Sequence, residues 1–307
     1  MSLFGRAATD FSDWLSGSPN ITELVKGSSV NLAVTGLSRA GKTVFITSLV
    51  HNLLSALHQP HRMPLLKMVG EGRLVASLLG AGNRNHLLRF PYEANLARMA
   101  ASPADWPPRT ADISEIEIEI RFVPSGAMGF FLGKVSSGLA TLTLRIIDYP
   151  GEWLLALPLL TQNYSDWSRA TINRCRRGVR AETAVDFLGF LSNHRFDASA
   201  NEDDAKRAHE LYRQHLVTAR ERHNLSFLQP GRFLDPGPLS VDTAFWFSPL
   251  DIPERAGQFA PHTLAALMER RFERYKAAIV MPFYRDHFRN FSRQVVLVVK
   301  AGAIIPH

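Results

Sequence analysis

The chain has 307 residues, of which 46% are hydrophobic and 21% are charged. These values are typical of a globular protein, and the length suffices for one large domain or two smaller ones. The formal net charge of +7 would suit a nucleic acid or an anionic lipid surface. The basic residues form no extended block, however, so we interpret them as scattered solvated side chains and expect no nucleic-acid partner.

The cysteine content and the hydropathy of the sequence indicate the cellular compartment of the protein. The single cysteine, Cys175, cannot form an internal disulfide, which favours a reducing cytoplasm. The neighbouring Arg174, Arg176 and Arg177 would lower its pKa, although a lone cysteine is more often inert than reactive. No run of about eighteen apolar residues is present, and the N-terminus lacks the apolar core of a signal peptide. We therefore expect a cytoplasmic protein without a transmembrane segment.

In chain order, the first segment is predicted to be helical. Apolar residues recur at helical spacing within residues 1–28, and a second short helical stretch covers Ile21–Val25. Acidic and basic residues are mixed on the polar side of the first helix. We therefore expect it to pack on the domain that follows, with an interfacial membrane helix as the alternative.

The most informative stretch is Val30–Leu49. The apolar run Val30–Val34 predicts a buried strand, and an apolar helical pattern begins at Val44. Between them, Gly36–Thr43 reads GLSRAGKT, which matches the phosphate-binding loop (P-loop) pattern G-x-x-x-x-G-K-[ST] in full. The strand before it and the helix after it are the context in which this motif binds phosphate.

Each part of this loop has an expected role. Gly36 and Gly41 let the backbone wrap closely around an anion, and the following helix presents free N–H groups. Lys42 would reach the outer phosphates and act in catalysis, while the Thr43 hydroxyl would ligate Mg²⁺. Arg39 could supply a charge to the transition state in cis, or cover the nucleotide's edge. The predicted nucleotide contacts within the loop are Gly36, Ser38, Arg39, Ala40, Gly41, Lys42, Thr43 and Val44.

The helix after the loop should continue to Leu57, where His58-Gln59-Pro60 ends it. Residues 60–113 are less regular and include a predicted helix around Gly72–Leu79. A mobile switch segment should lie here, with a hydroxyl that closes on Mg²⁺ and the terminal phosphate. Thr110 is our candidate for this catalytic contact, ahead of Ser114, with a helix or turn cap as the alternative role.

Two strands are predicted next. Glu115–Phe122 alternates perfectly, which places Ile116, Ile118 and Ile120 in the core and the charged residues, Glu115 among them, in water. A loop over 124–138 then leads into a strand over 139–147. Strands joined by such a hairpin run antiparallel, so we expect a mixed sheet in which the first and third strands are parallel.

The third strand is followed by Asp148-Tyr149-Pro150-Gly151-Glu152, a match to D-x-x-G. Asp148 would contact the Thr43-bound Mg²⁺, by way of water. Gly151 would offer its N–H to the terminal phosphate, so that hydrolysis becomes a change of shape. Glu152 would orient the attacking water or accept its proton, with a solvated switch residue as the alternative.

Two long motifs carry a family resemblance. DYPGEWLL over Asp148–Leu155 and TGLSRAGKTVF over Thr35–Phe45 resemble the YcjX-like family of bacterial stress-associated P-loop proteins. These are Ras-like GTPases with a large helical insertion. The resemblance implies binding of GTP and GDP, hydrolysis, a link to heat or envelope stress, and a membrane-protein partner, hence a place in the cytoplasm or at the inner membrane. The residues it carries over are Gly36, Gly41, Lys42, Thr43, Asp148 and Gly151.

The expected fold class is therefore α/β, a P-loop nucleoside triphosphatase with a Ras-like mixed sheet and a large α-helical insertion. Residues 1–155 would form the first part of the nucleotide domain, residues 156–290 the insertion, and residues 291–307 a return strand and the end of the nucleotide domain. The helices expected in the insertion are Gln162–Arg177, Glu182–Leu191, Asp203–Arg222 and His262–Tyr275.

After the apolar stretch Gln294–Val299, predicted as the fourth strand, the chain departs from the family. Family members continue into further strands and into a T/N-K-x-D motif that reads guanine, and this motif is missing here. We therefore expect a truncated or frame-shifted product with half of its base pocket and an exposed strand edge. An ATPase and a non-hydrolysing adaptor that acts through the helical insertion are the alternatives to a GTPase.

Overall fold

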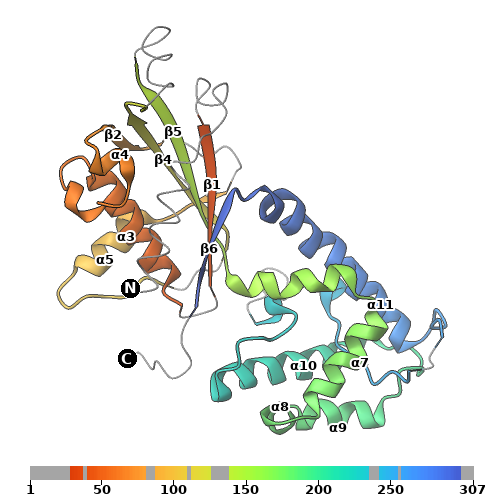
Figure 1. Cartoon of the computed structure of the whole chain (residues 1–307). Helices are drawn as coiled ribbons and strands as arrows, with labels where there is room; N and C mark the ends of the chain where they lie inside the picture. Colours follow the sequence, from red (N-terminus) through yellow and green to blue (C-terminus); the bar gives the residue numbers. More distant parts are fainter. Residues whose placement is uncertain are drawn as a thin grey trace. The chain divides into compact units, whose positions relative to one another are not determined.

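A computed structural model describes residues 28–36, 40–80, 87–108, 112–125, 138–234, 242–254 and 257–298 (Figure 1). The helical segments expected within residues 1–27 lie outside this part of the chain. The structure divides into two compact units, Met1–Pro150 with Phe291–His307, and Gly151–Asn290. Each unit is described by itself.

The first unit is a mixed α/β domain built on one sheet. Its strands are β1 (Ser28–Gly36), β2 (Leu74–Leu79), β3 (Leu88–Arg89), β4 (Ser114–Phe122), β5 (Ala140–Asp148) and β6 (Arg293–Leu297). Its helices are α3 (Lys42–Ser55), the 3₁₀ turn η1 (Pro60–Arg62), α4 (Lys67–Gly70) and α5 (Tyr92–Ala100). The helices α3, α4 and α5 lie on one side of the sheet (Figure 1).

The strand order is β2-β4-β5-β1-β6, with β3 also paired to β4. β1 runs parallel to both β5 and β6, while β4 runs antiparallel to β5 and to β2. The predicted mixed sheet is therefore confirmed, and so is the inward-facing set of isoleucines in β4. Ile116, Ile118 and Ile120 are each at most 3% exposed, because the alternation directs all three side chains into the core.

The helix predicted around Gly72–Leu79 is wrong. Leu74–Leu79 forms β2 and pairs antiparallel with β4. A short apolar run has the same pattern in a buried strand and in a buried helix, so periodicity alone does not distinguish them. The flanking residues do: Gly72 has φ +66, a backbone conformation that interrupts a helix just before the strand begins.

The prediction that Glu115 faces water is also wrong, since this residue is 4% exposed. β3 pairs with this end of β4, and the backbone N–H of Phe90 donates to the carbonyl oxygen of Glu115. Burial raises the pKa of the Glu115 carboxyl, against the opposing effect of Arg145. Glu117, two residues on, forms an ion pair with Arg145 at 2.9 Å, and both side chains are largely buried.

The second unit consists mainly of helices, as expected from its sequence. They are the 3₁₀ helix η2 (Gly151–Thr161), α7 (Tyr164–Cys175), α8 (Val179–Thr183), α9 (Val185–Asn193), α10 (Glu202–His223), the 3₁₀ turns η3 (Gly231–Phe233) and η5 (Thr243–Phe245), α11 (Leu264–Tyr275), the π-helical η6 (Lys276–Val280) and η7 (Phe283–His287), and the 3₁₀ turn η8 (Phe288–Asn290). The single helix predicted over Glu182–Leu191 is instead parts of α8 and α9, which meet at Ala184.

Three of the α-helices begin at residues whose side chains cap them. Asn163 accepts a hydrogen bond from the N–H of Asp166, and Asn201 and Thr263 do the same for α10 and α11. Such caps satisfy N–H groups that have no partner within the helix, and each contributes about 1 kcal/mol. Within the described residues, no helix is long and apolar enough to cross a membrane.

The core of the second unit is built on aromatic side chains. Trp167 on α7 is fully buried and stacks on Phe272 of α11, with ring centroids 5.1 Å apart. Tyr212 of α10 meets the same indole edge to face at 6.3 Å. Large rings contribute much buried area, and offset and edge-to-face contacts add to it. This cluster therefore joins α7, α10 and α11.

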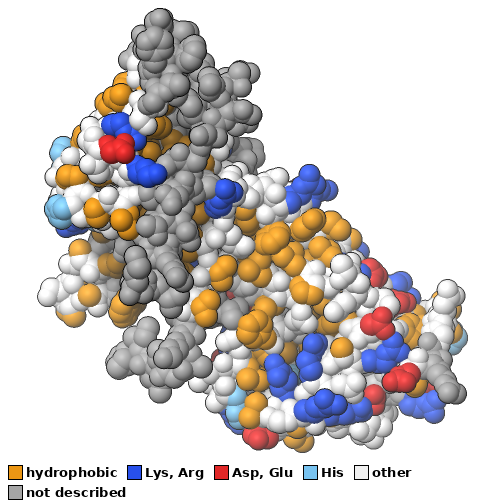
Figure 2. Space-filling view, viewed as in Figure 1, with side chains coloured by type: hydrophobic (Ala, Val, Ile, Leu, Met, Phe, Trp, Pro, Cys, Tyr) orange, Lys and Arg blue, Asp and Glu red, His pale blue; other side chains and the backbone are white. Residues whose placement is uncertain are grey.

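The surface of this unit agrees with our interpretation of the positive charge. On the face shown in Figure 2, Lys and Arg side chains are interspersed with Asp and Glu over the second unit. Several of them form exposed ion pairs, such as Arg176 with Asp251 at 2.5 Å. Exposed pairs of this kind add little to stability. They do, however, divide the basic charge into small neutralised groups.

Cys175 lies in a buried polar group. Its Sγ is 3.6 Å from Nε2 of His215, whose Nδ1 is 2.9 Å from the hydroxyl of Thr183. Burial raises the pKa of the thiol to about 11, although Arg174, Arg180 and Arg176 oppose the shift. Burial also lowers the pKa of His215 to about 4. The structure thus favours an inert cysteine, because desolvation outweighs the flanking charges.

This group makes the stability of the chain depend on pH. The imidazole of His215 has a pKa of about 4 when folded and 6.5 when unfolded, so its contribution is complete above pH 6.5 and is lost as the pH falls towards 4. Between pH 7 and pH 5, we expect the wild-type free energy of unfolding to fall by about 2 kcal/mol more than that of His215→Gln. Urea unfolding at both pH values measures this difference.

The matched control is His262→Gln, at an exposed histidine of the same unit, which should keep the wild-type dependence. Burial lowers the pKa of His209 too, so the His215→Gln variant should retain a smaller slope in the same direction. Identical pH dependence in His215→Gln and wild type would contradict this account.

Candidate functional site

The residue before α3 has a backbone conformation that suits an anion site at the start of a helix. Gly41 precedes the helix with φ +78 and ψ 19, a left-handed conformation that favours glycine, and it has no side chain with which to cap the helix. The first turn of α3 contains no acidic residue. The positive end of the helix dipole therefore meets no negative side chain within its own first turn, and it favours a bound anion.

Gly36, at the other end of the loop, is required for a different reason. A Cβ built there would lie 2.8 Å from the carbonyl oxygen of Leu297 and 2.9 Å from the Cβ of Ala40. The chain therefore turns tightly against β6 where β1 ends, and only glycine fits without a shift of the backbone. Ser38 and Arg39 lie outside the described residues, as does the switch candidate Thr110.

The residues expected to contact phosphate and metal begin α3. Lys42 is the first residue of the helix and is 8% exposed, and Thr43 and Val44 follow it half-buried. The carbonyl oxygen of Thr43 accepts a hydrogen bond from the hydroxyl of Thr47 at 2.7 Å, which ties down the first turn. Lysine is rarely this buried unless its charge is compensated, so its burial at an anion site is consistent with a phosphate contact.

Asp148 lies at the same edge of the sheet. It is the last residue of β5, it is 2% exposed, and it pairs in register with Val34 of β1, two residues before Gly36. The carboxyl ends of β1 and β5 thus bring Asp148 beside the start of the loop. A hydroxyl and a carboxylate are the hard oxygen ligands that Mg²⁺ prefers, so Thr43 and Asp148 fit this ion.

Magnesium is commonly held by one or two protein groups with water and phosphate oxygens completing its shell. Within the described residues, no group of three or more His, Cys, Asp or Glu side chains could hold a metal ion by itself. The site therefore fits a metal that arrives with a phosphate ligand better than it fits a metal held by the protein alone.

The end of β5 is tied to the start of β6 by Tyr149, a contact that sequence reasoning missed. Tyr149 is fully buried, its ring stacks on Phe291 with centroids 5.5 Å apart, and its hydroxyl accepts a hydrogen bond from Nε2 of Gln294. Burial raises the pKa of its hydroxyl. This contact holds together the two chain segments that enter and leave the second unit.

Gly151 and Glu152 begin η2, the first element of the second unit. Glu152 is 6% exposed, which contradicts the alternative that it is solvated. Its backbone is held at close range by Gly231: a Cβ built on this glycine would lie 1.9 Å from the carbonyl oxygen of Glu152. The two backbones therefore touch directly, and no larger residue fits at 231.

Two further contacts fasten the same segment. The guanidinium of Arg232 lies 3.6 Å above the ring of Trp153, and Nε2 of Gln229 donates to the carbonyl oxygen of Leu155 at 2.8 Å. A guanidinium over an indole face is attracted by the ring's negative face. We call Gln229, Gly231 and Arg232 the η2 clamp. The sequence indicated only a loop here, because nothing local in Pro-Gly-Arg shows which distant segment it meets.

Taken together, the first unit is a mixed α/β domain with a glycine-bounded loop and a buried aspartate at the carboxyl edge of its parallel strands. Residues 30–304 match the model of the YcjX-like family, DUF463, and the chain belongs to this family.

Two relatives carry the name "Ras-like GTPase YcjX". The protein from Escherichia coli K12 is 37% identical over 276 residues, and that from Shewanella oneidensis MR-1 is 34% identical over 281 residues. Each alignment covers 88% of this chain and 57% of the relative. The chain thus spans little more than half the length of these relatives.

The clamp can be tested by Gly231→Ala. Because the new Cβ would overlap the carbonyl oxygen of Glu152, we expect the free energy of unfolding to fall by about 1–3 kcal/mol. Gly189→Ala on α9 is the matched control: its Cβ would meet nothing within 4 Å, and alanine is the better helix former. Urea unfolding should therefore separate the two variants, and equal stability would mean that Gly231 is not pressed against Glu152.

Proposed function

We propose that this chain is a Mg²⁺-dependent nucleoside triphosphatase with a P-loop fold of Ras-like order, which binds GTP and hydrolyses the β–γ phosphate bond. The observation that carries the proposal is the loop Gly36–Thr43, with a left-handed glycine before an uncapped helix and a close-packed glycine after a parallel strand. The names of the two relatives support GTP as the nucleotide.

The residues of the loop would divide the work as follows. Backbone N–H groups from Gly41 into the first turn of α3 would bind the phosphates, and Lys42 would neutralise their charge. Thr43 and Asp148 would hold Mg²⁺, which when bound supplies positive charge against the phosphate oxygens. Ser38, Arg39, Ala40 and Val44 stay predicted nucleotide contacts.

Three residues outside the loop have proposed roles in switching and hydrolysis. Gly151 would give its N–H to the terminal phosphate, Glu152 would orient the attacking water, and Thr110 would close on the metal. These roles follow from the order of the motifs along the chain. The tight packing of Glu152 against Gly231 supports a fixed orientation for the backbone of this residue.

We further propose the domain organisation, a nucleotide domain interrupted by a helical subdomain that responds to the nucleotide. The boundaries proposed are 1–155, 156–290 and 291–307. A cytoplasmic location or attachment at the inner membrane, a role in stress response and a membrane-protein partner rest on the family resemblance alone.

An ATPase is the second candidate, because no T/N-K-x-D stretch occurs in the sequence. Phosphate contacts that come from one loop do not depend on the base, so they would serve either nucleotide. Comparison of the two nucleotides in one assay separates the candidates, and a chain that hydrolyses neither would favour the adaptor.

Phosphate release from GTP and from ATP, with Mg²⁺, tests the proposal directly. We expect hydrolysis that prefers GTP, and a loss of about 100-fold in kcat/KM in Lys42→Ala, because a cation at the transferred phosphate stabilises the transition state. Lys67→Ala on α4, which removes an exposed lysine of the same unit, is the control and should hydrolyse at the wild-type rate. Equal rates in Lys42→Ala and wild type would overturn the proposal.

A further inference from the structure

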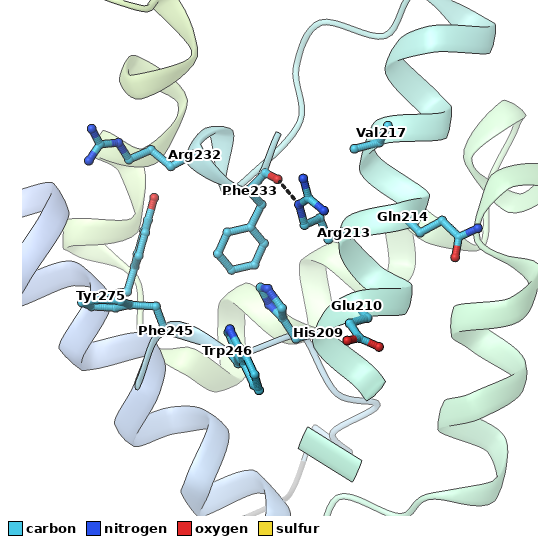
Figure 3. A pocket seen from close by; sticks show the side chains of 10 residues that line it. All are labelled: His209, Glu210, Arg213, Gln214, Val217, Arg232, Phe233, Phe245, Trp246 and Tyr275. Atoms are coloured by element: carbon cyan, nitrogen blue, oxygen red, sulfur yellow. Dashed lines mark hydrogen bonds between the residues drawn. The ribbon is translucent and has the colours of Figure 1, made fainter. Parts of the chain in front are cut away.

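The second unit contains a cavity of about 380 Å³ that the proposed hydrolysis does not use. Figure 3 shows the side chains around it, which come from α10, η3, α11, the end of η5 and the residue that follows η5. The lining residues that matter here are His209, Arg213, Phe233, Phe245, Trp246 and Tyr275. A cavity of this size accommodates a small organic molecule.

The walls of the cavity are aromatic. His209 meets Phe233 edge to face with ring centroids 4.7 Å apart, and its ring lies within 13° of parallel to that of Trp246. Phe233 and Phe245 are each less than 10% exposed, so their positions are fixed by packing. Flat rings held in fixed orientations favour a flat apolar ligand that can stack or pack edge to face against them.

Two side chains in this lining have donor groups without a hydrogen-bond partner among the described residues. Tyr275 is 1% exposed, and among the described residues its hydroxyl has no hydrogen-bond partner. Arg213 donates from Nε to the carbonyl oxygen of Phe233 at 2.9 Å, its only hydrogen bond within the described part of the chain, so its terminal amino groups are left for another acceptor. Arg213 is half-buried, so these amino groups can donate to an acceptor that enters the cavity.

The charge around the cavity favours an anion. The ammonium of Lys206 lies 5.5 Å from the centroid of the Trp246 ring, and Arg274 lies 5.9 Å from that of Phe245. In the lining itself, Arg213 and Arg232 carry positive charge, against the single carboxylate of Glu210. His209 adds no further charge, because burial lowers its pKa and its Nδ1 is paired with the carbonyl oxygen of Phe247 at 3.0 Å.

We propose that this cavity is a binding site for a planar organic anion, an aromatic ring that carries a carboxylate. The ring would pack among Phe233, Phe245 and Trp246, and the carboxylate would accept hydrogen bonds from the terminal amino groups of Arg213. Guanidinium and carboxylate match in charge and in their flat, two-pronged geometry.

The site also shares an element with the η2 clamp. Phe233 directly follows Gly231 and Arg232 in η3. A ligand that packs against the Phe233 ring would therefore contact the same turn that holds the backbone of Glu152. An effect of the ligand on hydrolysis would rest on the proposed function. Binding itself does not, since every residue that forms the cavity lies outside the phosphate loop.

Isothermal titration of the full 307-residue chain with 2-naphthoate and with the neutral 2-naphthalenemethanol tests the site without any nucleotide. We expect saturable binding of one naphthoate per chain, about tenfold tighter than binding of the alcohol, because a charge-assisted hydrogen bond is roughly twice as strong as a neutral one. Arg213→Gln should lower the affinity for naphthoate about tenfold and reduce its advantage over the alcohol. Arg207→Gln, an exposed arginine of the same helix, is the matched control and should bind as wild type does.

Arg213 also contacts the backbone of η3, so a second variant keeps the test independent of that contact. Val217→Trp places a large side chain in the cavity from the half-buried Val217 on α10 and removes no hydrogen bond. In a folded chain it should abolish naphthoate binding. No binding to the wild type, equal affinity for the acid and the alcohol, or unchanged binding in Val217→Trp would each overturn the proposal. GTP hydrolysis enters none of these outcomes, so the two proposals fail separately.

Discussion

The position of β1 between two parallel neighbours is the constraint on which the candidate site depends. Pairing with β5 sets Asp148 opposite Val34, and pairing with β6 sets Leu297 against Gly36. Both contacts lie at the carboxyl edge of the sheet, where the chain turns into α3. A phosphate site needs little more than this turn, because the backbone N–H groups and the helix dipole supply most of its attraction for an anion. In the proposed site, the side chains of Lys42, Thr43 and Asp148 would add charge and metal ligands.

Much of this edge could be predicted, because its signals are local. The apolar run of β1, the pattern of α3 and the alternation of Ile116, Ile118 and Ile120 each fix one element without knowledge of the rest. β2 could not be predicted in the same way, since a short apolar run has no period of its own. The prediction that Glu115 faces water fails for a related reason. Alternation shows which residues share a face of a strand, but it does not show whether another part of the chain covers the second face.

The second unit shows the same limit more strongly. Its helices could be predicted from apolar periodicity. The contacts that hold its segments together could not, because they join residues far apart in the sequence. Gly231 meets Glu152 at backbone distance, Arg232 covers Trp153, and Phe233 forms a wall of the aromatic cavity. One short turn thus contacts both the segment after the D-x-x-G motif and a site of quite different chemistry. These contacts motivate the prediction that this unit responds to the nucleotide state.

The central claim is that the backbone of the P-loop itself binds GTP, and the most direct measurement is titration of a fluorescent GTP analogue against two glycine variants. Gly41 and Gly72 both have positive φ, +78 and +66, and a Cβ added to either would meet no atom within 4 Å. Gly41→Val and Gly72→Val therefore introduce similar backbone strain, but only the first lies in the loop. The account predicts that Gly72→Val binds the analogue and that Gly41→Val does not. Equal affinity in the two variants would contradict it.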